Sequence, residues 1–137
     1  MRKSGFTLVE LLIVVTILGI LVAMVVPRLA GRTEQARRGR ADADVKGALP
    51  LALDLFEVDT GKYPTSEEGL NILLNAPPDA ESRNWHGPYL KQPPIDPWGH
   101  PYRYIYPGVK NPQDYDLFSI GPDGAEGTSD DTGNWKK

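Results

Sequence analysis

From Phe6 to Val26 the chain is apolar at nearly every position. At about 1.5 Å rise per residue, a helix of about 21 residues covers the roughly 30 Å hydrocarbon core of a bilayer. Glu10 is the one ionisable residue within this run, and a carboxylate at membrane depth costs several kcal/mol unless it is paired or lies near the interface. The pattern therefore predicts a transmembrane helix over residues 6–27 in which Glu10 needs a partner.

Residues 28–60 continue with amphipathic spacing, which predicts a stem helix. The apolar positions form two adjoining stripes, one made of Val45, Leu49, Leu53 and Phe56 and the other of Leu51, Leu55 and Val58. Because this apolar face is wide, we expect it to pack against a sheet. Gly61 suits the left-handed conformation that ends a helix.

Residues 61–137 predict a small head made of short elements. Thr65 and Glu68 form a capping box for a short helix through Leu74, and the proline-rich stretch 75–100 predicts an ordered loop wrapping the stem helix. Alternating residues over 102–106 and 115–119 predict two short strands around a turn at 107–112, and Trp98 is expected to be a core anchor. The predicted fold class is α+β, a long amino-terminal transmembrane and stem helix packed on a small antiparallel sheet with extended loops.

Composition narrows the possible functions. The formal net charge is −3, and loss of a leader containing Arg2 and Lys3 would leave 13 basic against 18 acidic residues. This balance argues against nucleic acid as a partner. Cysteine is absent, so no disulfide can staple the small head. His86 and His100 are the two histidines, each beside Gly or Pro, and no hydrolase or phosphate-loop motif accompanies them, so the prediction is that the chain is not an enzyme.

The apolar run lacks the ending of an ordinary secretory signal. Arg28 stands where a small residue should precede the cut, and the small residues Ser4 and Gly5 lie before the run instead. The sequence GFTLVE at residues 5–10 resembles the class III signal of type IV pilins and of type II secretion pseudopilins. DPWGHPYRY at residues 96–104 is similar to a segment of the major pseudopilins, the general secretion pathway protein G family, and together with Gly61, Tyr63 and Pro64 the resemblance covers nearly the whole chain.

This resemblance implies how the amino terminus is used. A prepilin peptidase would remove residues 1–5 by cutting between Gly5 and Phe6, and Phe6 would be N-methylated. Glu10 would then pair with the α-amino group of Phe6 on a neighbouring subunit, and such a pair is far less costly in low dielectric than a lone carboxylate. The alternative is a plain membrane anchor whose glutamate lies at the interface.

The resemblance also implies location and partners. The subunit would wait in the bacterial inner membrane as a single-pass protein, with its carboxy-terminal domain in the periplasm. It would then form a homopolymer with minor pseudopilins, driven by an inner-membrane assembly platform and its ATPase. The implied function is a periplasmic filament subunit that helps move folded proteins across the outer membrane. A type IV pilin of a surface or DNA-uptake fibre and a non-polymerising membrane-anchored binding module are the alternatives.

The tail at residues 119–131 combines three glycines with four acidic residues. Calcium prefers six to eight oxygen ligands in a flexible loop, although such a loop can equally be solvated, and the EF-hand spacing is missing. Major pseudopilins carry a calcium site in the corresponding loop, and the resemblance therefore implies a calcium clip. Glu126 is expected to lie outside it. The implied ligands are the carboxylates of Asp123, Asp130 and Asp131 and the carbonyls of Ser119, Pro122 and Ala125.

Two features of the stem leave alternatives open. Five arginines between Arg28 and Arg40 form either a solvated helix face or a contact with lipid head groups or neighbouring subunits. They also oppose the positive-inside rule for the topology that the resemblance implies. Pro27 is either a static kink or the place where pilin-like subunits lose helical order on assembly, and Pro50 puts the straightness of residues 46–55 in doubt.

Overall fold

The computed structural model describes the backbone of residues 5–78 and 84–136, together with their side chains except at residues 27–30. Apart from Gly5, the predicted leader lies outside these residues, as does the side chain of Arg28. The chain divides into two compact units, Met1–Ala36 and Arg37–Lys137. The second unit begins within the predicted stem, because the later turns of the stem supply part of the core of the head.

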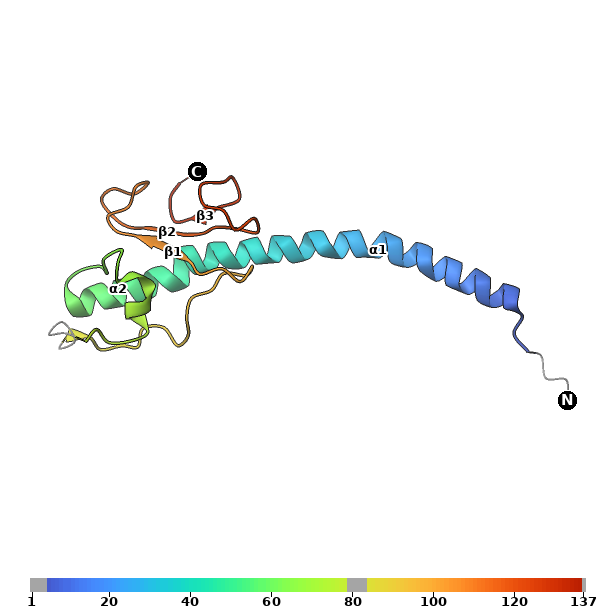
Figure 1. Cartoon of the computed structure of the whole chain (residues 1–137), viewed down its shortest axis with the longest axis horizontal. Coiled ribbons are helices and arrows are strands. Elements are labelled where there is room, and N and C mark those ends of the chain that lie inside the picture. The colour runs from blue at the N-terminus through green and yellow to red at the C-terminus, as the bar shows by residue number, and fades with distance from the viewer. Residues whose placement is uncertain (1–4, 79–83, 137) are drawn as a thin grey trace. The chain divides into compact units, whose positions relative to one another are not determined.

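Residues 8–60 are helical throughout, as α1 (Leu8–Ala43), the π-helical turn η1 (Asp44–Ala48) and α2 (Leu49–Thr60) (Figure 1). Pro27 does not end α1 in the single chain. Gly61 ends α2 as predicted, with a φ of 81° and its amide donating to the carbonyl of Glu57 at 2.7 Å. Pro50 stands in the first turn of α2, where a missing amide hydrogen is tolerated. The wide turn η1 lies directly before it.

The predicted short helix is a 3₁₀ helix, η2 (Gly69–Leu73). Its capping box is confirmed, since Glu68 Oε2 accepts from the amide of Thr65 at 2.6 Å and Thr65 Oγ1 accepts from the amide of Glu68 at 3.3 Å. The described part of the proline-rich stretch has no long helix or strand. It contacts the stem helix, where the hydroxyl of Tyr89 donates to Asp59 at 2.6 Å. The prediction of a wrapping loop is confirmed there.

Three antiparallel strands pair in the order β1-β2-β3. The predicted strands are present as β1 (Arg103–Ile105) and β2 (Asp116–Ser119), with Tyr104 opposite Leu117. The two-residue strand β3 (Thr132–Gly133) was not predicted, and it pairs Thr132 with Ser119. This pairing brings the end of the acidic loop back beside its beginning.

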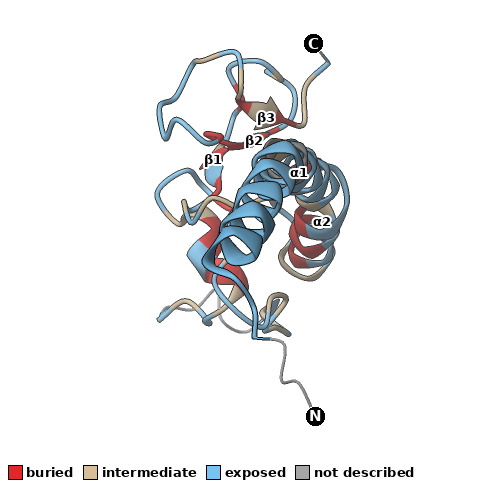
Figure 2. Cartoon of the chain, turned by 90° about the vertical axis from the view of Figure 1, so that its right-hand side faces the viewer, coloured by how far each residue is buried: buried red, intermediate tan, exposed pale blue. Residues whose placement is uncertain are grey.

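The core lies between α2, η2 and the sheet, and Figure 2 shows the buried segments in red on α2 and the strands. The first predicted stripe is buried there: Val45, Leu49, Leu53 and Phe56 are at most 4% exposed. The second stripe was predicted wrongly, since Leu51, Leu55 and Val58 are 62%, 49% and 76% exposed. One face of a helix turns toward the short sheet, and three strands are too few to cover both stripes. Trp98 is half-buried and outside this core, so its prediction as an anchor is also wrong.

Candidate functional site

The amino-terminal motif forms a capping box at the start of α1. The side-chain oxygen Glu10 Oε2 accepts hydrogen bonds from the amide and the hydroxyl of Thr7, each at 3.0 Å, and Thr7 Oγ1 accepts from the amide of Glu10 at 3.3 Å. This role of Thr7 was not predicted from the sequence, although a threonine three residues before a glutamate at the head of an apolar run is the usual signal of a capping box. In the single chain Glu10 thus has a local partner, and its pairing with Phe6 of a neighbour stays a prediction.

Gly5 and Phe6 precede the helix, and Phe6 is 83% exposed. The large apolar side chains that follow, from Leu8 to Val26, are each at least 50% exposed. By length and composition this helix could cross a membrane. A soluble protein does not leave so large an apolar surface in water, so this surface requires lipid or other helices around it.

The acidic loop gathers several of its predicted ligands around one atom, the hydroxyl oxygen of Thr128. This hydroxyl donates to Asp130 Oδ1 and lies 3.5 Å from Asp131 Oδ1 and 3.4 Å from the carbonyl oxygen of Ala125. The same hydrogen bond from Thr128 lowers the pKa of Asp130. Asp131 is buried, and its second oxygen accepts from the amide of Gly127 at 2.7 Å. Three of the six predicted oxygen ligands therefore converge, and Thr128 was not foreseen from the sequence.

Asp123 lies beside this group through its backbone but not through its carboxylate. Its amide lies 3.4 Å from Asp130 Oδ2, but its own carboxylate accepts from the amide of Ala125 at 2.9 Å. Within residues 5–78 and 84–136, no group of three or more acidic or histidine side chains is arranged to hold a metal. The donors that do converge are all oxygens, two of them carboxylate and one carbonyl, which is the chemistry that calcium prefers. The loop thus fits calcium in donor type.

Ser119 and Gly121 form the entry to the loop. Gly121 has a φ of 68°, and a Cβ atom on it would lie 2.6 Å from Asp130 Oδ2, so the close approach of the two loop ends requires glycine here. The hydroxyl of the fully buried Ser119 donates to Asp96 Oδ2 at 2.6 Å. Asp96 belongs to the DPWG block, and its carboxylate, rather than the Trp98 ring, is what that block buries.

The arginine cluster contacts an acidic side chain through Arg40. Arg40 Nε lies 3.7 Å from the carboxylate of Asp44, and both side chains are partly exposed. Arg32, Arg37 and Arg38 are exposed as well. A solvated helix face and a contact with lipid or other subunits both remain compatible with this exposure.

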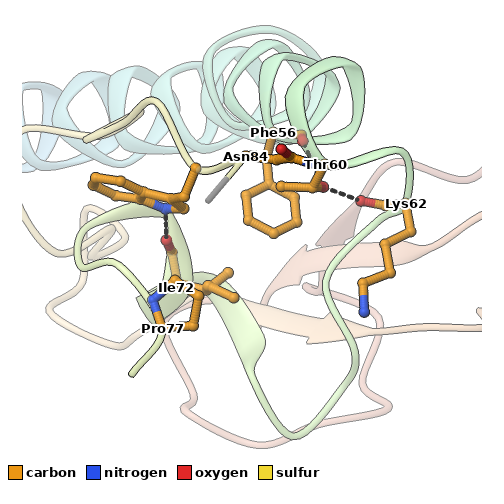
Figure 3. A pocket seen from close by; sticks show the side chains of 7 residues that line it. Phe56, Thr60, Lys62, Ile72, Pro77 and Asn84 are labelled. Carbon is orange, nitrogen blue, oxygen red and sulfur yellow. Dashed lines mark hydrogen bonds between the residues drawn. The ribbon is translucent and has the colours of Figure 1, made fainter. Parts of the chain in front are cut away.

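The pocket in Figure 3 is lined by residues of α2, of η2 and of the segment around Trp85. It has a volume of about 110 Å³, and its described lining is mainly apolar, with Lys62 as its one ionisable side chain. Dashed lines in Figure 3 mark the bonds from the Trp85 indole to the carbonyl of Ile72 and from Thr60 to the carbonyls of Phe56 and Lys62. His86 and His100 lie in loops, within 3.7 Å of Asp59 and Asp96 respectively.

Comparison with known proteins covers both parts of the chain. A prokaryotic N-terminal methylation motif matches residues 1–26, and the family described as type II secretion system protein G matches residues 28–135. The type II secretion system core protein G of Pseudomonas aeruginosa is 47% identical over 139 residues, covering 98% of this chain and 96% of the relative. That of Aeromonas hydrophila is 48% identical, covering 98% and 93%.

A solved structure agrees with these sequence matches. The crystal structure of the major pseudopilin from the type 2 secretion system of enterohaemorrhagic Escherichia coli is 40% identical, with a TM-score of 0.68 over 78% of this chain and 89% of that one. The family is one of structural pseudopilins. The α+β architecture, the methylation motif and the length of the matches lead to one assignment: this chain belongs to the type II secretion system protein G family.

Proposed function

We propose that this structural pseudopilus subunit is anchored in the inner membrane by its amino-terminal helix and then polymerises through the same helix. The observation that carries the proposal is the continuous exposure of the apolar side chains from Phe6 to Val26 on a helix whose first turn carries Glu10. Such a surface can be covered by lipid before assembly and by the helices of other copies afterwards. Growth of this filament would help to move folded proteins across the outer membrane.

Assembly would begin with removal of the leader. The bond between Gly5 and Phe6 lies outside the helix and joins two exposed residues, so a prepilin peptidase could reach it. Cleavage creates a new amino group at Phe6, four residues before Glu10, and N-methylation leaves that group able to carry a positive charge. A mature chain that still contains Gly5, shown by its intact mass, would refute this step.

In the filament, Glu10 would exchange its bonds to Thr7 for the Phe6 amino group of a neighbouring copy. An ion pair in apolar surroundings fixes one stagger between helices, because any other stagger leaves two uncompensated charges. The experiment is to express Glu10→Ala and Glu10→Asp chains beside the native one and to image the filaments. Both substitutions should abolish or strongly reduce filaments while the head stays folded. Normal filaments from Glu10→Ala would contradict the proposal.

The acidic loop would hold calcium as a clip on the head. Asp130, Asp131 and the Ala125 carbonyl already converge, and Asp123 with the Ser119 and Pro122 carbonyls would complete an oxygen shell. When bound, the cation would neutralise the neighbouring carboxylates and tie the two ends of the loop together in a protein without cysteine. Calcium titration by calorimetry should show one site, and Asp130→Ala with Asp131→Ala should lose it.

The head would lie in the periplasm. The contacts with the assembly platform and its ATPase, and with the minor pseudopilins, would be made through the anchored helix and the filament. The methylation motif and the amino-terminal position of the apolar helix support this orientation. The exposed arginines after the apolar run oppose it by charge alone. A reporter active only in the cytoplasm, fused after Lys137, should be silent, and an active one would reverse the topology.

A further inference from the structure

Asp96 is a buried carboxylate that lies 23 residues before the acidic loop in sequence and contacts its first residue in space. Its side chain is 0% exposed. Asp96 Oδ1 accepts hydrogen bonds from the amides of Trp98 at 3.0 Å and His100 at 2.8 Å. A buried carboxylate is costly unless donors surround it, and these two amides fix its orientation within the turn.

The other oxygen, Asp96 Oδ2, accepts from the hydroxyl of Ser119 at 2.6 Å. Ser119 is 0% exposed and is the last residue of β2. A hydroxyl has one proton to donate. Because the Ser119 hydroxyl donates it to Asp96, a lone pair of Ser119 Oγ accepts from the amide of Gly121 at 3.1 Å. The charged acceptor makes the first of these bonds strong and sets the direction of the second.

Gly121 connects this hydrogen-bonded group to the acidic loop. A Cβ atom on Gly121 would lie 2.6 Å from Asp130 Oδ2 and 2.9 Å from the carbonyl oxygen of Asp130, so the two segments are in close contact. A second contact comes from the same turn, since a Cβ atom on Gly124 would lie 3.3 Å from His100 Nε2. The turn at residues 96–100 therefore supports the loop at two places.

We infer that Asp96 is a positioning residue for the calcium loop, acting through the Ser119 hydroxyl on Gly121 and so on Asp130. The inference rests on the proposed calcium site and adds a residue to it. In this inference Asp96 orients the chain of hydrogen bonds that leads to the loop and does not bind the cation itself. Residues that orient metal ligands from behind commonly change metal affinity by about 10- to 100-fold when they are substituted.

The test measures calcium affinity on the mature chain in detergent, by calorimetric titration, for Asp96→Asn, Ser119→Ala and the double variant. Asparagine keeps one oxygen for the two turn amides but faces the Ser119 hydroxyl with a second donor. Alanine removes the hydroxyl and leaves the Ser119 carbonyl in place. Each single variant should weaken calcium binding about tenfold or more. The double variant should be no weaker than the poorer single one, because both break the same link.

Ser66→Ala is the matched control. The Ser66 hydroxyl also donates to one group and accepts from another. These are the carbonyl of Tyr106 at 3.0 Å and the amide of Tyr106 at 2.8 Å, and both lie outside the acidic loop. This control should lower the melting temperature without changing calcium affinity. Native affinity in Asp96→Asn and Ser119→Ala, with only a lower calcium-free melting temperature, would overturn the inference. Absence of calcium binding by the native chain would overturn the proposed site together with it.

Discussion

Asp116 shows at the residue scale how one buried carboxylate can organise a turn. Its two oxygens accept from three successive amides, those of Val109, Lys110 and Asn111, at 2.7, 2.8 and 2.9 Å. Asp116 is 2% exposed and begins β2. The turn between β1 and β2 is therefore tied to the first residue of the strand that follows it.

Replacing Asp116 by alanine should destabilise the head by about 3 kcal/mol, because three amides lose a charged acceptor in a buried place. Chemical denaturation of the mature chain measures this difference. Asp114→Ala is the control, since Asp114 is exposed and accepts from a single amide, that of Tyr115 at 2.8 Å. Equal effects of the two substitutions would contradict this account of the turn.

The core tyrosines predict a loss of stability in alkali. Burial, aided by the hydrogen bond to Asp44, raises the pKa of Tyr102 above its usual value. Burial and the bond to Asp54 raise the pKa of Tyr63 to about 12. A raised folded-state pKa contributes stability that is complete below the unfolded pKa, about 10, and is lost as pH rises toward the folded value. The melting temperature should therefore fall between about pH 9 and pH 12.

Tyr102→Phe separates the tyrosine contribution from that of other groups titrating in alkali. This variant should be less stable at neutral pH, since Asp44 loses a donor at 2.8 Å, and should show a smaller alkaline decline. Melting curves with tyrosinate absorbance recorded in parallel give both quantities. An unchanged melting temperature while tyrosinate forms in the folded chain would refute the assignment.

The residues whose roles could be predicted from the sequence are those marked by their immediate neighbours in the chain. Glu10 is recognisable because it interrupts an apolar run, and Gly61 because it follows a helical pattern. Asp96 and Asp116 were not recognised, since their importance comes from partners far along the chain that no local pattern records. Thr128 was missed for the same reason, as a threonine in a polar loop gives no signal of the three oxygens that its hydroxyl meets.

At the scale of elements, α2 carries two apolar stripes, one buried and one exposed. The spacing of apolar residues predicted the helix and its end correctly, but the width of the apolar face was misleading. Spacing records which residues share a face and not how far the opposing sheet extends. The strand β3 escaped prediction because two residues are too short to show alternation.

The two stripes predict different costs for the same substitution. Leu53→Ala should cost about 3 kcal/mol, because Leu53 is 0% exposed and its removal leaves a cavity. Leu55→Ala, two residues along the same helix, should cost less than about 1 kcal/mol, because Leu55 is 49% exposed. Denaturant midpoints of the two variants provide the comparison. A larger effect at Leu55 would mean that the second stripe, and not the first, faces the core.

At the scale of the whole molecule, a small head without cysteine must hold a long, irregular tail in place. Between β2 and β3 the chain passes through the acidic loop with few apolar anchors, and the short pairing of β2 with β3 joins its ends. A cation bound to the folded head alone would add stability in proportion to RT ln(1 + [L]/Kd), about 2.7 kcal/mol at a hundredfold excess over Kd.

Calcium should therefore raise the melting temperature of the mature chain relative to chelator, and magnesium should raise it less, because magnesium demands a tighter octahedral shell. In Asp130→Ala with Asp131→Ala the calcium shift should disappear. The same melting temperature in calcium and in chelator would leave the loop as a solvated polar segment, and the clip would then have to be abandoned.

The central claim is that copies of this chain assemble through the amino-terminal helix, with Glu10 paired across subunits. The most direct measurement is an electron cryo-microscopy reconstruction of filaments of the mature chain, with side chains visible in the apolar core. The account predicts the Glu10 carboxylate within about 4 Å of the Phe6 amino nitrogen of a neighbouring copy, the range of an ion pair. A reconstruction in which Glu10 still caps Thr7 of its own chain, with the neighbouring amino group elsewhere, would contradict it.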